Sequence, residues 1–537
     1  MKTNIIFNKM KKNLFLLIAS LFLCGSIFGQ EHHFICNADQ FSDNMSFYAA
    51  VTIDGTYVNS TNYEVGAFVG DECRMSAFFN YEILPSSPVI WSAVNYTNSG
   101  EEVTFKLYDH NTGRTYEQCS FTAVTSEDGY TGINGDYTGY NISGIEDLVV
   151  LPFTTPTHTL EIDGYGNTEE ASNYYLVSSP IGEVSPTAVA NMIPSDNNFD
   201  LFYFDQAQDL EWINYKHSSF NLEVGKGYLY ANKTGEDLVF TGFPYEEAVT
   251  VTLVKDKGNN EVGFEGWNLI GNPYGVAATI DRSYYVMNEG GTELLATMQS
   301  GDIPAMNGVF VLANSDGEQM DITPGSSKAS SNMVSVDLCN ENSQVIDRAI
   351  VRFGNGDLLP KFQINENSTK IYIPQNNVDY AILNANNEGQ MPVNFKPAKN
   401  GNYSLIVTPE NLEMEYLHLI DNLTGADVDL LANPKYNFSG NTEDYAARFT
   451  LRFRANNSVD INETFCPMTY RQDGTLAING IQGESELMLI DMLGRVVSKE
   501  SFNIIDGVVR NINTTPGVYV VRLINNNNIY TQKIVVE

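Results

Sequence analysis

The C-terminal stretch TLAINGIQGESELMLIDMLGRVVSKESFNIIDGVVRNINTTPGVYVVRLINNNNIYTQKIVVE, residues 475–537, decides how this chain is interpreted. Apolar and polar residues alternate along it with a period of two, which is the pattern of strands that are buried on one face. Turn residues interrupt this alternation at Gly480, Gly483, Gly494, Asp506, Gly507, Pro516 and Gly517. The pattern predicts a small antiparallel β-sandwich.

Three motifs stand out within this stretch: LMLIDMLGRVV at 487–497, PGVYVVRL at 516–523 and TQKIVV at 531–536. In their order and spacing they closely resemble the type A C-terminal sorting domain of cargo of the type IX secretion system of Bacteroidetes. The resemblance implies a sorting domain over residues 466–537 with an immunoglobulin-like fold. The motif residues that form the candidate sorting site are Gly494, Arg495, Gly517, Tyr519 and Lys533.

The same resemblance implies partners and a route. The type IX secretion machinery would bind the tail, and its sortase would cut in or near the polar linker at 454–465. An exposed sheet edge offers unpaired backbone groups to a receptor, so the strand PGVYVVRL or the final TQKIVV is the expected recognition element. The resemblance therefore implies a location at the cell surface or outside the cell.

The N-terminus has the pattern of a secretory signal peptide over residues 1–29. Lysines at positions 2, 9, 11 and 12 precede an apolar run at 14–24, and small residues follow before Gln30. The expected cleavage is after Gly29. A lipoprotein would use Cys24, but Leu23 is too bulky for the usual lipobox. No later segment has the ~18 apolar residues of a membrane helix, so we expect a soluble mature protein without a transmembrane segment.

The chain is strongly acidic, with 30 basic and 66 acidic residues and a formal charge of −36. The signal peptide contains four lysines and no carboxylates, so its removal lowers this charge from −36 to −40. Such a surface repels nucleic acid and anionic membranes, and a nucleic-acid partner is not expected. The preferred interpretation is that acidity keeps a secreted β-protein in solution, and the alternative is cation binding.

Residues 30–152 form the first expected β-sandwich. Short alternating segments predict strands at 47–53, 63–69, 74–79, 89–95, 102–109 and 116–124. Near its end the sequences DGYTG at 128–132 and GDYTG at 135–139 gather oxygen ligands of the kind that bind calcium. Their spacing differs from that of an EF-hand loop, so turn formation is the preferred interpretation and no cofactor or metal is expected.

Five cysteines remain after processing, at positions 36, 73, 119, 339 and 466. This number is small and odd, which excludes a disulfide framework, and no CxxC spacing suggests zinc. Around Cys73 and Cys119 the apolar alternation predicts that both thiols point into one core. The alternation allows a Cys73–Cys119 disulfide, and two buried free thiols are the alternative.

Residues 158–323 contain an internal repeat. YYLVSSPIG at 174–182 returns as WNLIGNPYG at 267–275, and GYLYANKTGEDLVFTG at 227–242 returns as GVFVLANSDGEQMDITPG at 308–325. Two related β units with one strand order are predicted, because half a repeat buries its apolar face poorly. The aromatic residues could form a sugar-binding platform, but their alternation favours a place in the core: Trp212, Tyr215, Tyr228 and Tyr230.

A serine-rich linker leads to a third β-sandwich at 333–453. Its alternating segments include RAIVRF at 348–353, YSLIV at 403–407 and ARFTLRF at 447–453. Asp421, Asp427 and Asp429 could be a metal cluster. We favour a turn residue followed by a solvated strand face.

The motif inventory favours a protein without catalytic activity. The chain has six histidines and lacks HExxH, GxSxG and phosphate-binding glycine loops. The four β segments also leave no room for a catalytic domain of another fold. The sequence predicts a secreted or surface-displayed modular β-protein that binds a glycan or protein ligand or has a structural role. The alternative is a glycan-acting hydrolase with an unrecognised carboxylate pair.

Overall fold

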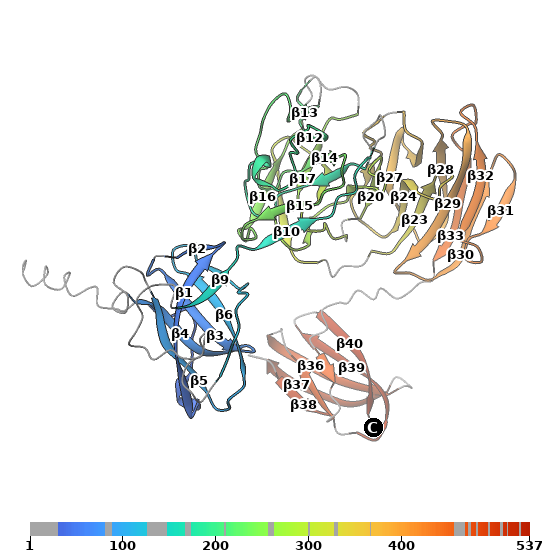
Figure 1. The fold of residues 1–537 in the computed structure, drawn as a ribbon. Coiled ribbons are helices and arrows are strands. Elements are labelled where there is room, and N and C mark those ends of the chain that lie inside the picture. The colour runs from blue at the N-terminus through green and yellow to red at the C-terminus, as the bar shows by residue number, and fades with distance from the viewer. Residues whose placement is uncertain are drawn as a thin grey trace, which may run out of the picture. The chain divides into compact units, whose positions relative to one another are not determined.

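The computed structural model describes residues 31–58, 60–80, 89–125, 148–166, 173–208, 211–255, 263–298, 301–326, 331–365, 367–455, 468–470, 474–478, 482–491, 495–504, 508–512, 514–525 and 528–536. In these ranges strands dominate, and the helical segments are the 3-10 turns η1 (Ala38–Gln40) and η3 (Pro186–Ala188) (Figure 1). The prediction of an all-β chain of tandem sandwiches is confirmed. The expected signal peptide lies outside the described residues. Among the described residues, no helix has the length and apolar character needed to span a bilayer.

The N-terminal module is a nine-stranded sheet with the order β2-β1-β5-β4-β3-β6-β7, in which β8 pairs with β6 and β9 with β1. Alternate residues of these strands pack into one core that includes Phe47, Val65 and Phe105. The segment predicted as one strand at 116–124 is instead interrupted between β7 and β8. The strands are β1 (Asp43–Ile53), β2 (Thr56–Tyr57), β3 (Tyr63–Val69), β4 (Glu72–Asn80), β5 (Val89–Tyr96), β6 (Glu102–Asp109), β7 (Arg114–Tyr116), β8 (Ala123–Val124) and β9 (Val149–Phe153).

The cysteine prediction for this module is wrong. Cys73 forms a disulfide with Cys36, and Cys119 is a free, half-buried thiol. The cause is a β-bulge: Ala67 lies opposite Met75 but Phe68 lies opposite Cys73, which leaves one extra residue in β4. The bulge turns Cys73 away from the main core and into a separate cluster with Phe68, whereas Cys119 packs against the main core.

The duplicated region contains two four-stranded sheets with the same strand order, β11-β14-β12-β13 and β17-β21-β19-β20. In each unit the preceding strand pairs with the last one, as β10 with β15 and β16 with β22. The first unit has β10 (Thr157–Leu160), β11 (Tyr175–Val177), β12 (Phe199–Phe204), β13 (Trp212–Asn214), β14 (Tyr228–Asn232) and β15 (Leu238–Thr241). The second has β16 (Val249–Leu253), β17 (Trp267–Gly271), β18 (Ala278–Thr279), β19 (Tyr284–Met287), β20 (Leu294–Thr297), β21 (Gly308–Leu312) and β22 (Glu318–Pro324).

The two units contact each other through reciprocal backbone pairs. Lys226 of the first unit bridges to Ile270 of the second, and Asn307 bridges to Val177. In the repeat alignment, Asn307 corresponds to Lys226 and Val177 to Ile270, so the same contact is made twice with the roles exchanged. Such an exchange is the signature of a pseudo-twofold, self-complementary interface.

Hydrogen bonds beside these bridges repeat the exchange. The amide of Gly271 donates to the carbonyl of Gly225 at 2.9 Å, and the amide of Ser178 donates to the carbonyl of Met306 at 2.8 Å. Gly225 and Met306 both have left-handed φ angles, 76° and 63°. Methionine rarely adopts a positive φ angle, so the interface imposes the left-handed backbone conformation at both Gly225 and Met306.

The third region forms a sheet with the order β31-β30-β33-β28-β26-β27-β24-β23-β29-β32, in which β25 pairs with β27. One hydrophobic core runs from the duplicated region into this sheet, where the ring of Phe362 stacks on Trp267 at 4.2 Å. The strands are β23 (Met333–Cys339), β24 (Val345–Phe353), β25 (Leu359–Pro360), β26 (Lys370–Gln375), β27 (Val378–Ala385), β28 (Glu388–Lys396), β29 (Gly401–Glu410), β30 (Met414–Asp421), β31 (Ala426–Asp429), β32 (Lys435–Gly440) and β33 (Phe449–Ala455).

The C-terminal tail is a sandwich of a three-stranded sheet, β34-β35-β38, and a four-stranded sheet, β37-β36-β39-β40 (Figure 1). Its core includes Leu487, Val521 and Ile534. The strands are β34 (Met468–Tyr470), β35 (Thr475–Ile478), β36 (Gly483–Asp491), β37 (Val496–Ile504), β38 (Val508–Asn511), β39 (Gly517–Asn525) and β40 (Asn528–Val536).

The repeat interface predicts a strong penalty for a side chain at Gly271. A Cβ at this position would lie 2.3 Å from the Cβ of Ser178 and 2.5 Å from the carbonyl oxygen of Lys226. Gly271→Ala should therefore lower the free energy of unfolding by about 1–3 kcal/mol, the usual cost of overpacking. In Gly290→Ala, the control, the new Cβ would meet no atom closer than 3.7 Å. Denaturant unfolding of both variants checks this, and equal midpoints would contradict the interface.

Candidate functional site

The first sorting motif closes a β-hairpin between β36 and β37. Asp491 accepts hydrogen bonds from the backbone amide of Arg495 at 3.0 Å and from its Nε at 2.7 Å. The amide of Asp491 donates to the carbonyl of Arg495 at 2.9 Å, which completes the turn. Arg495 itself is exposed, and Gly494 lies outside the described residues. The motif therefore combines a turn fixed by Asp491 with a presented guanidinium.

The other two motifs form neighbouring strands. Tyr519 in β39 is buried, and its hydroxyl donates to the carbonyl of Thr515 at 2.9 Å. Gly517 begins β39 opposite Val536, near the end of β40. Lys533 in β40 is exposed, and β40 pairs with β39 on one side only. The structure thus brings Gly517, Tyr519 and Lys533 into one strand pair, and an edge strand carries the lysine.

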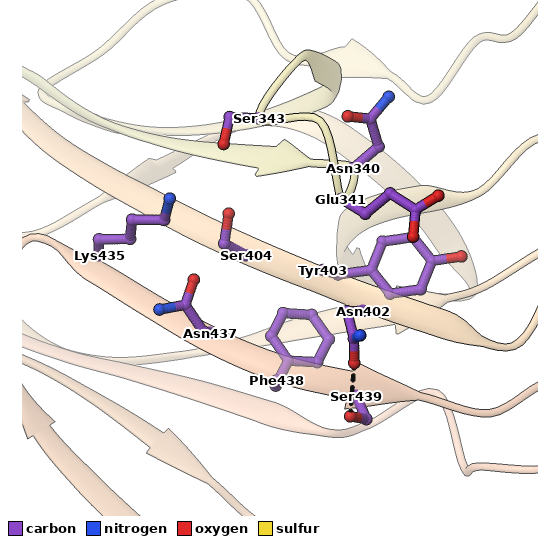
Figure 2. Close-up of a pocket in the computed structure, with 10 residues that line it drawn as sticks. All are labelled: Asn340, Glu341, Ser343, Asn402, Tyr403, Ser404, Lys435, Asn437, Phe438 and Ser439. Atoms are coloured by element: carbon purple, nitrogen blue, oxygen red, sulfur yellow. Dashed lines mark hydrogen bonds between the residues drawn. The ribbon is translucent and has the colours of Figure 1, made fainter.

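A polar hollow of about 390 Å³ lies on the third sheet (Figure 2). Its floor is the pair β29 and β32, where Asn402 lies opposite Ser439 and Ser404 opposite Asn437. The side chains on this face alternate with Tyr403 and Phe438, whose rings are buried. The hydroxyl of Ser439 donates to Oδ1 of Asn402 at 2.9 Å. Period-two alternation of polar and aromatic residues is thus what creates a polar face above an aromatic core.

The turn between β23 and β24 forms one wall of this hollow. Asn340 stabilises the turn, because its Oδ1 accepts the amides of Asn342 at 2.9 Å and Gln344 at 3.1 Å. Glu341 and Ser343 are exposed on this wall. Figure 2 shows Ser343 across from Lys435 and Ser404, and Lys435 is half-buried.

A buried ion pair stabilises the floor of the hollow from below. The guanidinium of Arg448 donates to Asp421 at 3.0 and 3.3 Å and to the carbonyl of Ser439 at 2.7 Å. The same guanidinium lies over the ring of Phe438 at 4.7 Å. Burial alone would raise the pKa of Asp421, but hydrogen bonds led by Arg448 and Tyr436 outweigh it and lower the pKa. The charged pair therefore persists and keeps β32 in place.

This arrangement suits a ligand that is rich in hydroxyl and amide groups. Asn402 and Asn437 present amides, and Lys435 and Glu341 add one charge of each sign. Among the described residues that line the hollow, Glu341 is the single carboxylate, and neither aromatic ring is exposed. Recognition here would depend on hydrogen bonds without ring stacking, and the hollow lacks the acid pair of a glycosidase.

A second hollow, of about 430 Å³, lies between the two duplicated units and contains Asp205 and Glu223. Both carboxylates have partners of their own. Asp205 accepts the amide of Ala207 at 3.0 Å, and Glu223 pairs with Lys226 at 3.3 Å. These contacts stabilise turns at the interface.

The remaining sequence candidates divide between core and surface. Tyr228 and Tyr230 are fully buried, and Trp212 and Tyr215 pack against cores, so these four residues form no exposed platform.

Asp427 and Asp429 lie on an exposed face, as the preferred interpretation expected, whereas Asp421 is fully buried. The repeats at 128–139 that were considered for calcium lie outside the described residues. The described residues contain no group of three or more His, Cys, Asp or Glu arranged for a metal.

Comparison with known proteins identifies the tail. Residues 472–537 match the family described as the secretion system C-terminal sorting domain. The chain ends in a secretion system C-terminal sorting domain. This domain supports a type IX secretion system substrate, typical of Bacteroidetes, and implies interaction with the type IX machinery and export to the cell surface or the extracellular space. No curated protein matches the chain.

Sequence reasoning missed a buried acid in the N-terminal module, because no motif marks it. Glu64 in β3 is fully buried and accepts the amides of His33 at 2.8 Å and Phe34 at 3.1 Å. Nε2 of His110 lies 2.7 Å from its second oxygen, and the hydroxyl of Ser76 donates to its first. The carboxylate thereby ties the N-terminal segment, next to the Cys36 disulfide, to the sheet.

Glu64 predicts an acid-dependent loss of stability. Burial alone would raise its pKa, but the hydrogen bonds from Ser76, His33, His110 and Phe34 outweigh burial and lower the pKa below 4.5. A lowered carboxyl pKa stabilises the fold above the unfolded-state value and loses this effect as the pH falls through the folded-state value. Glu64→Gln should cost about 1–3 kcal/mol at neutral pH and flatten the dependence below pH 4.5. Calorimetry from pH 7 to pH 3 checks this, and an unchanged profile would exclude the role of Glu64.

Proposed function

We propose that the chain is a non-enzymatic modular β-protein that binds a polyhydroxylated ligand, such as a glycan segment, after type IX export. The observation that carries this proposal is the polar hollow on β29 and β32, with its paired Asn402 and Asn437 amides on rigid strands. Sites on strands position hydrogen-bonding groups more accurately than sites on loops. The ion pair of Arg448 and Asp421 supports the same floor.

Export by this route begins with a signal peptide, which we assign to residues 1–29 on the basis of the lysine-rich start and the apolar run that follows. The acidic composition supports a protein that stays dispersed outside the cell. We also infer that the two units at 158–323 arose by duplication. Their common strand order and the exchanged Lys226–Ile270 and Asn307–Val177 bridges support this.

Ligand binding can be tested at the hollow. On a glycan array the full chain should bind a subset of glycans, and Asn402→Ala or Asn437→Ala should each weaken that binding roughly tenfold, the effect of about one lost hydrogen bond. Asn221→Ala is the matched control, because Asn221 is exposed in the duplicated region and its side-chain amide donates to Glu183 at 2.7 Å. An array without binding, or equal losses in all three variants, would contradict the proposal. Release of reducing sugar by the wild type would instead indicate the hydrolase.

Export can be tested at the last strand. Deleting residues 529–537 removes β40 together with Ile534 and Val536 of the tail core, so the sorting domain should fail and the protein should stay in the periplasm. Lys533→Glu changes an exposed residue of the same strand and should reduce export with the tail still folded. Lys399→Glu, at an exposed upstream lysine, is the control. Fractionation of a host with a type IX system decides, and normal surface delivery of the deletion would refute the role of the tail.

A further inference from the structure

A lysine and an aspartate form a buried pair in the core between the duplicated region and the third sheet. Nζ of Lys361 donates to Oδ1 of Asp347 and, at 3.2 Å, to the carbonyl of Arg348. The side chains of Lys361 and Asp347 are only 3% and 1% exposed. Charged side chains are seldom this deeply buried, because leaving water costs more than one ion pair returns.

The backbone on both sides of Lys361 is fixed, so its amine cannot turn outward. The buried hydroxyl of Tyr285 donates to the carbonyl of Pro360 at 2.9 Å and accepts the amide of Phe362 at 3.0 Å. The amide of Lys361 donates to the carbonyl of Asp379 at 2.8 Å. These bonds and the burial of the side chain hold the amine beside the carboxyl group, where proximity favours a reaction between them.

The carboxyl group of Asp347 is surrounded by backbone donors. The amide of Ile371 donates to Oδ2 at 2.7 Å, and the amide of Arg348 donates to Oδ1 at 2.9 Å. Donors in these positions stabilise negative charge on the two oxygens when the carbon becomes tetrahedral. The pair thus has a nucleophile, an electrophilic carbon and donors for an oxyanion, and both side chains are almost fully buried.

The surroundings favour the neutral forms of both groups. Burial raises the pKa of Asp347 and lowers the pKa of Lys361, so a neutral acid can face a neutral amine. A third group, Glu293, interacts electrostatically with both members and accepts a hydrogen bond from Ser368 at 2.7 Å. Burial raises the pKa of Glu293 to about 7.

We propose that Lys361 and Asp347 condense into an intramolecular isopeptide bond. The lone pair of the neutral Nζ attacks Cγ of the protonated carboxyl group, and the Cγ–Nζ bond forms. The bond from Cγ to its hydroxyl then breaks, and the hydroxyl leaves with one Nζ proton as water. No oxidant or other reactant is needed. The amide replaces a buried pair of ionisable groups and links β24 to the segment that follows β25.

Peptide mapping of the denatured wild-type protein tests this bond directly. Trypsin should release a branched peptide that joins residues 329–348 to residues 353–370, lighter than the sum of the two by one water, because an acylated Lys361 is not cleaved. The mass of the intact protein should also be lower by one water, beyond the decrease in mass that the Cys36–Cys73 disulfide causes. If the digest instead contains the linear peptides 353–361 and 362–370 and no branched peptide, the map of the wild-type protein alone overturns the proposal.

One variant separates the chemistry from the fold. Lys361→Arg introduces a guanidinium that can bond Asp347 but has no nucleophilic amine, so the branched peptide should disappear in a protein with an unchanged circular dichroism spectrum. A branched peptide at this site in Lys361→Arg would overturn the role of Lys361.

Discussion

The exchanged backbone contacts between the two duplicated units are the constraint on which the larger part of the structure depends. Gly271 donates to Gly225, and Ser178 donates to Met306 at the equivalent position. Each unit thereby pairs its backbone with that of the other at two equivalent places. The side chain of Gln206 strengthens this interface, because its Nε2 donates to the carbonyls of Val254 and Trp267 and its Oε1 accepts the amide of Gly266, all at 2.8 Å. A buried amide with such partners specifies one register.

The paired units in turn provide the surface on which the third sheet is assembled. Phe362 enters their aromatic core, where it contacts Trp267, Tyr285 and Phe310. Asp357 accepts the amide of Ser283 at 2.8 Å and its hydroxyl at 3.0 Å, and thus adds a polar contact across the same boundary. The polar hollow lies on this third sheet, on the strands β29 and β32.

Local pattern predicted most of the fold. Period-two alternation predicted the sandwiches, the repeat predicted two units with one strand order, and the motifs of the tail predicted its strands and its family. The failures have a common physical origin in contacts that alternation does not encode. The bulge opposite Phe68 reversed the direction of Cys73, and Asp421 became buried because Arg448 lies beside it in the fold. No sequence pattern indicated the buried pair of Lys361 and Asp347, because tertiary packing brings the two residues together.

The central claim is that the duplicated units and the third sheet form one cooperative body. Native-state hydrogen exchange of the full chain under increasing denaturant tests it most directly, because amides that open in one event share one opening free energy. We expect the amides of Ser178, Gly271 and Ile371 to lose protection together, at a single opening free energy. Earlier loss of protection at Ser178 than at Gly271, or at either of these than at Ile371, would contradict the account.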